Sequence, residues 1–455
     1  MPAVGWQVRQ RICLAMRQTV ELAEYESRIV RFGKPTSDDQ SLAARLSRGG
    51  DLGARLDVRW LAGGRAEVKA NSWVGVAQFS NVDVRVVPKI VGGPLRVVEM
   101  IEYSAGISLL ERIPEATLNA SGRDLFELIV RLFVEETNRL ARDGLNRDYR
   151  QTEETLPVMR GRLRTREQFM RQYGTVHRLE CCYDEYDGDI PDNQILAQAL
   201  AAASAHALSD GLRADLATLV RLFASVCDPP KHRIDWYTGR IRYNRRNERY
   251  RRAHELATLV IQGLTLDNLL DTSAQKVDAF LIDMNVIFER FITRLVTDAL
   301  KRTEFSVSPQ ESFRAVVINE RTGKTYGRIR PDLVINDHAG NRYPVDVKYK
   351  LYSEQKISAD DIYQTFLYAY ALGGDRDQAT AGLIFPATSS EPGPRIRIQR
   401  ENNFAVAARI LSTGVDVPSV LSALRRHDPD LTYAAIRGFL REILRQPISP
   451  RWTQV

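Results

Sequence analysis

The sequence has few of the residues that form disulfides, zinc sites and iron–sulfur clusters. Its 455 residues include four cysteines and six histidines. The histidines show no metal-ligand spacing, and the cysteines are equally scattered, at Cys13, Cys181, Cys182 and Cys227. This scarcity argues against a disulfide framework, a zinc site and the nucleases that carry an iron–sulfur cluster. The adjacent Cys181 and Cys182 are interpreted as strand or core residues.

Long apolar runs are also absent. No run of the sequence reaches the length that a membrane-spanning helix needs. The first residues contain no apolar segment of the kind found in signal peptides. We therefore expect a cytoplasmic protein that has no contact with a membrane.

A nucleotide-binding loop is missing as well. The tetrapeptide from Thr322 to Thr325 contains Gly-Lys-Thr, which also occurs in the phosphate-binding loop of NTPases. That loop requires an earlier glycine, and the corresponding position here is Ile318. The tetrapeptide is better explained as the tight turn of a hairpin between residues 316–318 and a strand from Tyr326 onward. The chain is therefore predicted to have no nucleotide site of its own.

What the sequence does contain is sufficient for several folded domains. Its length suggests about three domains, and its hydrophobic fraction of 44% is enough for packed cores. The formal net charge is +7 and the isoelectric point is about 9.2. This moderate excess of positive charge is compatible with a polyanionic partner.

Residues 1–100 are predicted to form a β-rich module. Short segments rich in valine and aromatic residues follow one another with turn residues between them. The predicted strands are residues 56–61, 66–70, 73–79 and 82–87. Residues 36–54 are polar and rich in glycine and serine, so we expect a loop there.

Residues 101–265 change to a helical period and are predicted to form a mainly helical middle domain. Apolar residues recur three and four positions apart over residues 125–133. Two strands are expected as an insertion, near residues 157–165 and 178–183.

Residues 240–252 are the densest basic run of the chain. Arginine interleaved with tyrosine suits contact with DNA, because it can grip phosphates and stack on bases. The same run equally suits a solvated helix start or a face towards an acidic partner, so it is not assigned to a site.

Residues 266–455 alternate predicted strands and helices and form the third predicted domain. Residues 381–386 are predicted to be a buried strand because they are largely apolar. Residues 395–399 alternate charged and apolar side chains, which favours an edge strand. Residues 403–445 are predicted to return to helix.

The most informative feature lies in this third domain, where Asp332 is followed fourteen residues later by Asp346 and then by Lys348. Two apolar runs flank the polar segment 337–341, which is typical of a β-hairpin. Residues two apart on a strand share a face, so Asp346 and Lys348 point the same way. If the hairpin closes around Ala339, Asp332 lies opposite Asp346.

Two carboxylates and an ammonium at one strand end suit hydrolysis of a phosphodiester with the help of Mg²⁺. This ion takes carboxylate oxygens and waters as ligands, and it can activate a water and offset charge on a phosphate. A surface hairpin with a cross-strand ion pair would show the same spacing. The flanking segments favour the metal site, because helix-like residues 286–292 contain Glu289 and helix-like residues 361–370 contain Gln364.

The order of these elements resembles the PD-(D/E)xK nuclease superfamily over roughly residues 275–390. In that superfamily a helix with a glutamate is followed by Pro-Asp, by Asp-x-Lys and by a helix with a glutamine. The resemblance implies a C-terminal α/β domain of the restriction-endonuclease type that cleaves DNA.

The same resemblance implies a role for each residue of the pattern. Asp332 and Asp346 correspond to the metal ligands, with Mg²⁺ as the cofactor. Lys348 corresponds to the residue that orients the attacking water and offsets charge on the scissile phosphate. Glu289 and Gln364 correspond to the accessory helix residues of the same site.

A second set of motifs narrows the resemblance. Upstream of the hairpin the chain contains, in order, WVGV at residues 73–76, VPKI at 87–90, LARDGL at 140–145, LPVMRGRL at 156–163, YDEY at 183–186 and DIPDNQIL at 189–196. This ordered set is similar to the McrC family over about residues 70–390. McrC is the nuclease subunit of the McrBC modification-dependent restriction system.

The McrC resemblance implies partners as well as an activity. McrC-like proteins act with McrB, an AAA+ GTPase that forms hexameric rings and binds the GTP. The N-terminal part of McrC docks into the ring and stimulates GTP hydrolysis, and the C-terminal part cuts double-stranded DNA, which carries a modification. By this resemblance residues 1–100 match the ring-facing position. The chain has extra sequence before residue 70 and after residue 400 compared with compact members of the family.

The expected architecture is therefore an α+β multidomain chain with a β-rich N-terminal module, a mainly helical middle and a C-terminal α/β nuclease domain. The leading functional hypothesis is a Mg²⁺-dependent DNA endonuclease subunit driven by an AAA+ GTPase partner. Two alternatives remain open. The chain could be a non-catalytic regulator or stalk that organises and activates the ring, or a solitary RecB-like nuclease without a ring partner.

Overall fold

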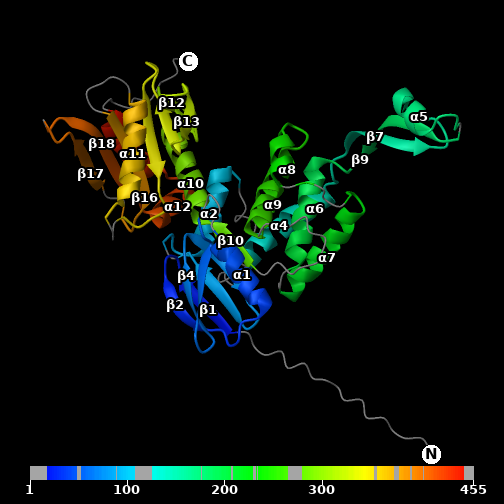
Figure 1. Ribbon diagram of the computed structural model, residues 1–455, viewed down its shortest axis with the longest axis horizontal. Coiled ribbons are helices and arrows are strands. Elements are labelled where there is room, and N and C mark those ends of the chain that lie inside the picture. The colour runs from blue at the N-terminus through cyan, green and yellow to red at the C-terminus, as the bar shows by residue number, and fades with distance from the viewer. Residues whose placement is uncertain are drawn as a thin grey trace, which may run out of the picture.

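The computed structural model describes residues 18–48, 53–88, 90–107, 125–175, 177–205, 209–228, 232, 234–264, 279–352, 356–373, 379–389, 392–402 and 404–444. Figure 1 shows a group of N-terminal strands, a C-terminal sheet flanked by helices, and a group of middle helices from which an arm projects. One continuous cluster of buried apolar side chains extends through all three groups. The α+β multidomain fold expected from the sequence is confirmed. Among the described residues, no helix has the length and apolar character needed to cross a membrane.

The N-terminal strands form two sheets. The first has the order β1-β6-β5-β10 and the second the order β2-β4-β3. Their bounds are β1 Gln18–Ala23, β2 Ser27–Arg31, β3 Leu56–Leu61, β4 Arg65–Ala70, β5 Trp73–Gln78, β6 Val82–Val87 and β10 Ala279–Asp283. The strands predicted between residues 56 and 87 are therefore confirmed. Their valines and aromatic residues fill the space between the sheets.

The loop expected over residues 36–54 is wrong for most of its length, because Ser37–Ser47 form helix α1. Thr36 and Asp39 make a capping box, in which each side chain accepts a hydrogen bond from the backbone N–H of the other. The buried Leu42 and Leu46 then anchor the helix. The polar composition belongs to the exposed face and the cap, so it does not signal a loop.

Strand β10 joins the N-terminal sheet although it follows the middle domain in sequence. It pairs antiparallel with β5, with Leu281 opposite Gly75. The backbone of Gly75 has φ +138°, and a Cβ there would lie 2.1 Å from the carbonyl oxygen of Phe280. Only glycine allows this approach. The first and third predicted segments thus share one sheet, and their boundaries at residues 100 and 265 stay predictions.

The middle of the chain is mainly helical. Its helices are α2 Pro94–Ala105, α4 Leu125–Arg142, α6 Pro191–Ser204, α7 Asp210–Ala224, α8 Ile234–Arg240 and α9 Arg251–Leu264. Helices α4 and α6 both bury apolar side chains against α9. The period predicted over residues 125–133 is confirmed by the buried face of α4.

An arm projects from these helices, as Figure 1 shows. It consists of β7 Asp148–Leu156, β8 Arg162–Leu163, helix α5 Thr165–Arg171 and β9 Leu179–Asp187, in the sheet order β7-β9-β8. The strand predicted near 178–183 is confirmed within β9, where Cys181 and Cys182 are buried and free. The strand predicted at 157–165 is reduced to the two residues of β8.

Part of the basic run 240–252 stabilises the middle helices. Arg249 donates to the carbonyl oxygen of Gly144 and, at 2.7 Å, to Oδ1 of Asn146. Arg251, the first residue of α9, pairs with Glu248 at 2.6 Å. These two arginines are therefore engaged within the chain, and contact of the run with DNA stays a prediction.

The C-terminal sheet has the strand order β11-β14-β15-β16-β18-β17. Its strands are β11 Ser306–Pro309, β14 Leu333–Asn336, β15 Arg342–Val347, β16 Ala379–Pro386, β17 Pro392–Gln399 and β18 Val406–Val415. Strand β16 is buried throughout and β17 is an edge strand, so both predictions are confirmed. The helix expected from residue 403 is wrong for β18, which pairs parallel with β16. Strand β18 lies between β16 and β17. Every second residue from Ala408 to Gly414 is buried, and this two-residue period is that of a strand and not of a helix.

Helices cover both faces of this sheet. They are α10 Met284–Ala299, α11 Ala359–Leu372, α12 Val417–Arg425 and α13 Asp430–Leu444. Ala381 of β16 clusters with Ala369 of α11, whereas Gly382 lies against Ile443 of α13. Consecutive strand residues point to opposite faces, so α11 and α13 lie on opposite sides. The hairpin predicted around the Thr322–Thr325 tetrapeptide is confirmed as β12 Phe313–Asn319 and β13 Lys324–Ile329. Its turn lies at residues 320–323, and β13 begins at Lys324, two residues earlier than predicted.

The buried His254 of α9 makes the stability of the fold depend on pH. Its Nε2 donates to the carbonyl oxygen of Asp192 at 2.8 Å, and its Nδ1 accepts from the hydroxyl of Tyr243 at 3.1 Å. Burial lowers the pKa of His254 from 6.5 to about 4. The unfolded chain therefore binds more protons than the folded chain between these values, and stability falls as the pH is lowered through this window.

We expect His254→Gln to reduce this acid loss of stability by about 2–3 kcal/mol, because the substituted side chain has no proton to bind. Urea unfolding at a series of pH values measures the effect. The exposed His177 provides the matched control, His177→Gln, which should leave the pH dependence unchanged. An equal pH dependence in the wild type and His254→Gln would contradict the assignment.

Candidate active site

The hairpin predicted around Ala339 is present and brings the two aspartates together. Strands β14 and β15 pair with Leu333 opposite Val345 and Ile335 opposite Tyr343. Continued by one position, this register sets Asp332 opposite Asp346. A hydrogen bond of 2.7 Å from the backbone N–H of Val347 to Oδ2 of Asp332 ties the two strand ends together.

Asp346 is a buried carboxylate with little compensation from protein groups. Its side chain is 1% exposed, and its Oδ2 lies 3.0 Å from Nζ of Lys348. Neither of its carboxylate oxygens accepts a hydrogen bond of good geometry from the described residues. Burial of a carboxylate is costly, and the raised pKa of Asp346 shows that Lys348 offsets this cost only in part.

The site carries more negative than positive charge. Burial, together with the charges of Asp346 and Glu289, raises the pKa of Asp332 to about 8. Burial also raises the pKa of Asp346, against the opposing effect of Lys348. Burial disfavours the charged form of Lys348, but the two aspartates outweigh this and raise its pKa. When both aspartates are ionised, one ammonium does not balance them, and a divalent cation could.

The donor set fits Mg²⁺ better than a zinc-like metal. Among the described residues, no group of three or more histidine, cysteine, aspartate or glutamate side chains is arranged to hold a metal. Mg²⁺ commonly uses one or two carboxylates and completes its shell with waters and substrate phosphates. Asp332 and Asp346 supply two carboxylates at one strand end, and Oδ1 of Asp346 accepts no hydrogen bond from the described residues.

The two flanking helices bring Glu289 and Gln364 to the same place. Gln364 of α11 accepts a hydrogen bond of 3.0 Å from Nζ of Lys348. Glu289 of α10 accepts one of 2.7 Å from Gln310, whose backbone N–H donates to the carbonyl oxygen of Asp332 at 2.9 Å. All five residues of the sequence pattern thus converge, and their catalytic roles stay proposals.

Sequence reasoning missed Asp361, which fixes the segment after Lys348. Its carboxylate accepts hydrogen bonds from Lys350 at 2.8 Å, from the hydroxyl of Tyr352 and from Ser358. Burial alone would raise the pKa of Asp361, but these donors outweigh it and lower the pKa. The spacing of Ser358 and Asp361 at a helix start was a usable signal, because it matches a capping pattern.

A second missed group joins the N-terminal module to the site. The hydroxyl of Tyr349, next to Lys348, donates to Glu24 at 2.6 Å. The hydroxyl of Tyr25 donates to the carbonyl oxygen of Tyr349 at 2.8 Å. The ring of Tyr349 also packs against Phe288, the neighbour of Glu289, with ring centroids 5.6 Å apart. Glu24 and Tyr25 are 325 and 324 residues from Tyr349 in the sequence, and Phe288 lies in a different element. No local sequence pattern could reveal these contacts.

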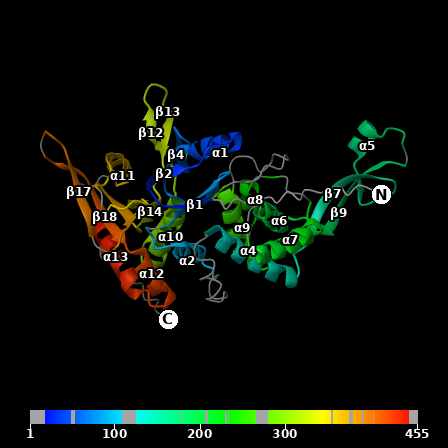
Figure 2. The ribbon, with the colours of Figure 1, turned by 90° about the horizontal axis from the view of Figure 1, so that it is seen from below.

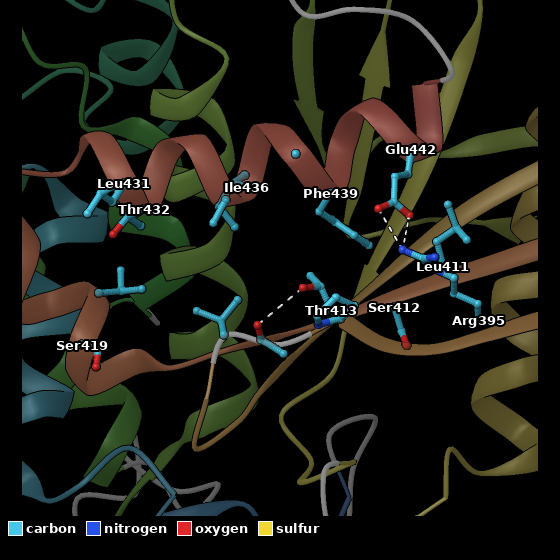
Figure 3. Close-up of a pocket in the computed structure, with 16 residues that line it drawn as sticks. Arg395, Leu411, Ser412, Thr413, Ser419, Leu431, Thr432, Ile436, Phe439 and Glu442 are labelled. Atoms are coloured by element: carbon cyan, nitrogen blue, oxygen red, sulfur yellow. Dashed lines mark hydrogen bonds and ion pairs between the residues drawn. The ribbon is translucent and has the colours of Figure 1, made fainter.

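Two cavities lie near or beyond the site. One of about 760 Å³ lies between α9 and α10 and reaches Glu289 and Gln310. Another of about 380 Å³ lies between β18, α12 and α13 and is shown in Figure 3, where Arg395 pairs with Glu442 at one end. The second cavity includes none of the five candidate residues.

Comparisons with known proteins agree on one family. The model of the family described as McrBC 5-methylcytosine restriction system component matches residues 68–386, which is 319 of the 455 residues. A search of curated proteins found no match.

Two solved structures were matched, and the first of them is similar in fold. The first is the refined half-complex from the tetradecameric assembly of Thermococcus gammatolerans McrB AAA+ hexamers with bound McrC. Its matching chain is 19% identical with a TM-score of 0.54, over 94% of this chain and 100% of that chain. The second is the cryo-EM structure of the Thermococcus gammatolerans McrBC complex, with 21% identity and a TM-score of 0.42, over 62% of this chain and 88% of that chain. At these identities the likeness concerns the fold, and the assignment rests on the family match. The chain belongs to the family of McrBC 5-methylcytosine restriction system components.

Proposed function

We propose that this chain is the McrC-like subunit of a McrBC-type restriction complex, a Mg²⁺-dependent endonuclease that cleaves modified double-stranded DNA. The observation that carries the proposal is the convergence of Asp332, Asp346 and Lys348 at one strand end, in a chain of the McrBC family. The order of helix α10, the β14–β15 hairpin and helix α11 around these residues supports a PD-(D/E)xK nuclease domain. The excess of buried negative charge supports a divalent cation there.

Each residue has a distinct task in this reaction. Asp332 and Asp346 would hold the Mg²⁺, which supplies an activated water and positive charge at the phosphate when bound. Lys348 would offset the charge that develops on the phosphate oxygens. Gln364 keeps the Lys348 ammonium in position by accepting its hydrogen bond. Glu289 and Gln310 border the site and hold the backbone before Asp332.

The McrB-like AAA+ GTPase hexamer is the proposed partner, and it would bind the GTP. Soluble proteins rarely expose contiguous apolar patches without a partner. The projecting arm exposes Val158, Met159, Phe169, Met170 and Tyr173, each more than half exposed. The arm therefore offers a docking surface for the ring, in addition to the N-terminal residues 1–100 to which the family resemblance assigns docking.

The arm provides a test of partner binding. We expect the triple variant Phe169→Ser/Met170→Ser/Tyr173→Ser to bind the AAA+ partner tenfold or more weakly and to lose stimulation of its GTPase. Removal of large apolar side chains from an interface typically lowers affinity by about this factor. Gel filtration and GTP hydrolysis assays measure both effects. These side chains are exposed, so the arm should stay folded on its β7–β9 ladder.

A matched control uses Phe404→Ser/Leu431→Ser, because these apolar residues are equally exposed but lie in the C-terminal part. The control should bind and stimulate the partner as the wild type does. Unchanged binding by the arm variant would place the docking surface elsewhere, with residues 1–100 as the next surface to alter.

The alternative function, a non-catalytic regulator of the ring, makes a different prediction for DNA. A regulator would stimulate the GTPase but leave plasmid DNA intact in the presence of Mg²⁺, partner and GTP. The nuclease would nick or cut the plasmid in the same reaction. A solitary nuclease would cut DNA without binding any AAA+ partner.

A further inference from the structure

We propose that the β12–β13 hairpin is a DNA-binding element that holds the duplex next to the cleavage site. This inference rests on the proposed nuclease function and adds where the substrate binds. Figure 2 shows the hairpin extending away from the C-terminal sheet that carries the candidate site. A two-stranded antiparallel ribbon of this kind is one of the elements that the major groove of DNA admits.

The hairpin is anchored at its base by apolar contacts on one face. Phe313 pairs with Ile329 across the ribbon. Ile329 is buried and clusters with Tyr368 and Leu372 of α11. This packing fixes the ribbon to the helix that also carries Gln364, so the hairpin and the candidate site move as one unit.

The opposite face of the ribbon is basic and exposed. Side chains alternate between the two faces of a strand. Lys324, Tyr326 and Arg328 therefore lie on the face opposite to that of the buried Ile329. Arg314 follows Phe313 on the paired strand, where the β12 register becomes irregular. All four side chains are exposed. Residues 313–329 contain four cations and one carboxylate, that of Glu320.

These cations have no partner of their own within the described part of the chain. Arg314, Lys324 and Arg328 form no ion pair there, whereas Arg342 beside the ribbon pairs with Glu311 and packs over the ring of Phe313. Free cations on a rigid ribbon are complementary to the phosphates of DNA. Tyr326 is 78% exposed and could pack against a sugar or a base in the groove.

The position of the ribbon relative to the candidate site suits this role. Strand β13 ends at Ile329, three residues before Asp332. An extended chain covers at most about 11 Å over three residues. The six residues of β13 then span roughly 20 Å, so the basic face can contact phosphates on both sides of a groove about 12 Å wide. The duplex would lie with the scissile phosphate at the carboxylates.

The test compares two matched double variants of the full-length chain, Arg314→Gln/Arg328→Gln on the ribbon and Arg397→Gln/Arg400→Gln. The second pair is equally exposed at the β17 edge of the C-terminal sheet, with Arg397 in β17 and Arg400 directly after it. Binding of a short DNA duplex is measured by fluorescence anisotropy in EDTA over a series of salt concentrations, so no cleavage interferes. We expect the ribbon variant to bind about tenfold more weakly and its salt slope to fall by roughly two, one for each lost phosphate contact.

Tyr326→Ala gives an independent readout. It should weaken DNA binding several-fold without changing the salt slope, because no charge is removed. The β17 variant should keep both the affinity and the slope of the wild type. An equal loss in both double variants would overturn the proposal, because it would show a diffuse effect of net charge.

The outcomes also separate this inference from the nuclease assignment. If the wild type cuts DNA but the ribbon variant keeps its affinity and slope, the ribbon proposal fails and the nuclease assignment stands. If the ribbon variant loses DNA binding but the wild type never cuts, the nuclease assignment fails and the ribbon remains a DNA-binding element. Loss of AAA+ partner binding with intact DNA binding would make the ribbon a partner surface and overturn the proposal.

Discussion

Replacing Asp346 by asparagine is expected to abolish DNA cleavage while leaving the chain folded and able to bind its partner. The amide keeps the shape of the side chain but removes the charge that would hold a divalent cation. Loss of a metal ligand and of the activated water costs on the order of a thousandfold or more in rate. Cleavage of plasmid DNA by the reconstituted complex, followed over time, measures this loss.

The same substitution should not destabilise the chain. Asp346 is buried, and burial raises its pKa in spite of the Lys348 ammonium 3.0 Å away, so its charge is a net cost to the metal-free fold. We expect the free energy of unfolding of Asp346→Asn in EDTA to stay within about 1–2 kcal/mol of the wild type, because the relief of a buried charge is offset by loss of the ion pair with Lys348. Loss of activity without loss of stability is typical of a functional residue.

A control substitution separates the site from general effects of charge. Asp360 is exposed on the first turn of α11, beside the site but outside it. Asp360→Asn should cleave DNA and stimulate the partner GTPase like the wild type. Wild-type cleavage by Asp346→Asn in the same assay would show that the proposed metal site is wrong, and the regulatory alternative would then gain support.

Mg²⁺ is expected to stabilise the chain more strongly as the pH rises, and this effect should disappear in Asp346→Asn. The pKa of Asp332 is raised from 3.8 to about 8, mainly by burial and by the charges of Asp346 and Glu289. Between these values the folded chain binds more protons than the unfolded chain. Stability of the metal-free chain therefore falls as the pH rises through this window, by on the order of a few kcal/mol.

A bound cation reverses this trend because it favours the charged form of both carboxylates. Thermal unfolding in EDTA and in excess Mg²⁺, at about pH 6 and about pH 8, measures the difference. We expect the Mg²⁺-induced rise in unfolding temperature to be small at the lower pH, where protons compete, and several degrees at the higher pH. A rise that is the same at both pH values, or that persists in Asp346→Asn, would place the metal elsewhere.

This stability test does not depend on the partner or on DNA. It therefore reports on the candidate metal site even if the complex cannot be reconstituted. His254 responds in the opposite sense, because its lowered pKa makes the chain lose stability towards acid. The two effects can be distinguished. Mg²⁺ should change how stability depends on pH at high pH, and it should leave unchanged the loss of stability at low pH that His254 causes.

Strands were the elements that the sequence specified best. Those between residues 56 and 87 were predictable because valine and aromatic residues alternate with turn residues over short distances. The hairpin around Ala339 was predictable for the same reason, and its register followed from the position of the polar turn. The edge position of β17 followed from its alternating charged side chains.

Other elements were missed where context outweighed composition. Helix α1 looks like a loop because most of its residues are polar, yet its capping box and two buried leucines fix it. Strand β18 lies in a segment with helical composition, but β16 and β17 form backbone hydrogen bonds with it on both sides. Such pairing partners are distant in sequence, so intrinsic propensity cannot reveal them.

The sequence by itself determined the chemical inventory of the candidate site. Asp332, Asp346, Lys348, Glu289 and Gln364 could be named from spacing and from the family pattern, because strand alternation and hairpin closure are local properties. Only the tertiary structure decided how these residues are charged and held. Burial raises the pKa of the aspartates, Glu24 and Tyr25 hold Tyr349 from across the chain, and β12–β13 carries a basic face beside the site. These properties arise from contacts between segments up to 325 residues apart, and burial and charge density exist only once those segments meet.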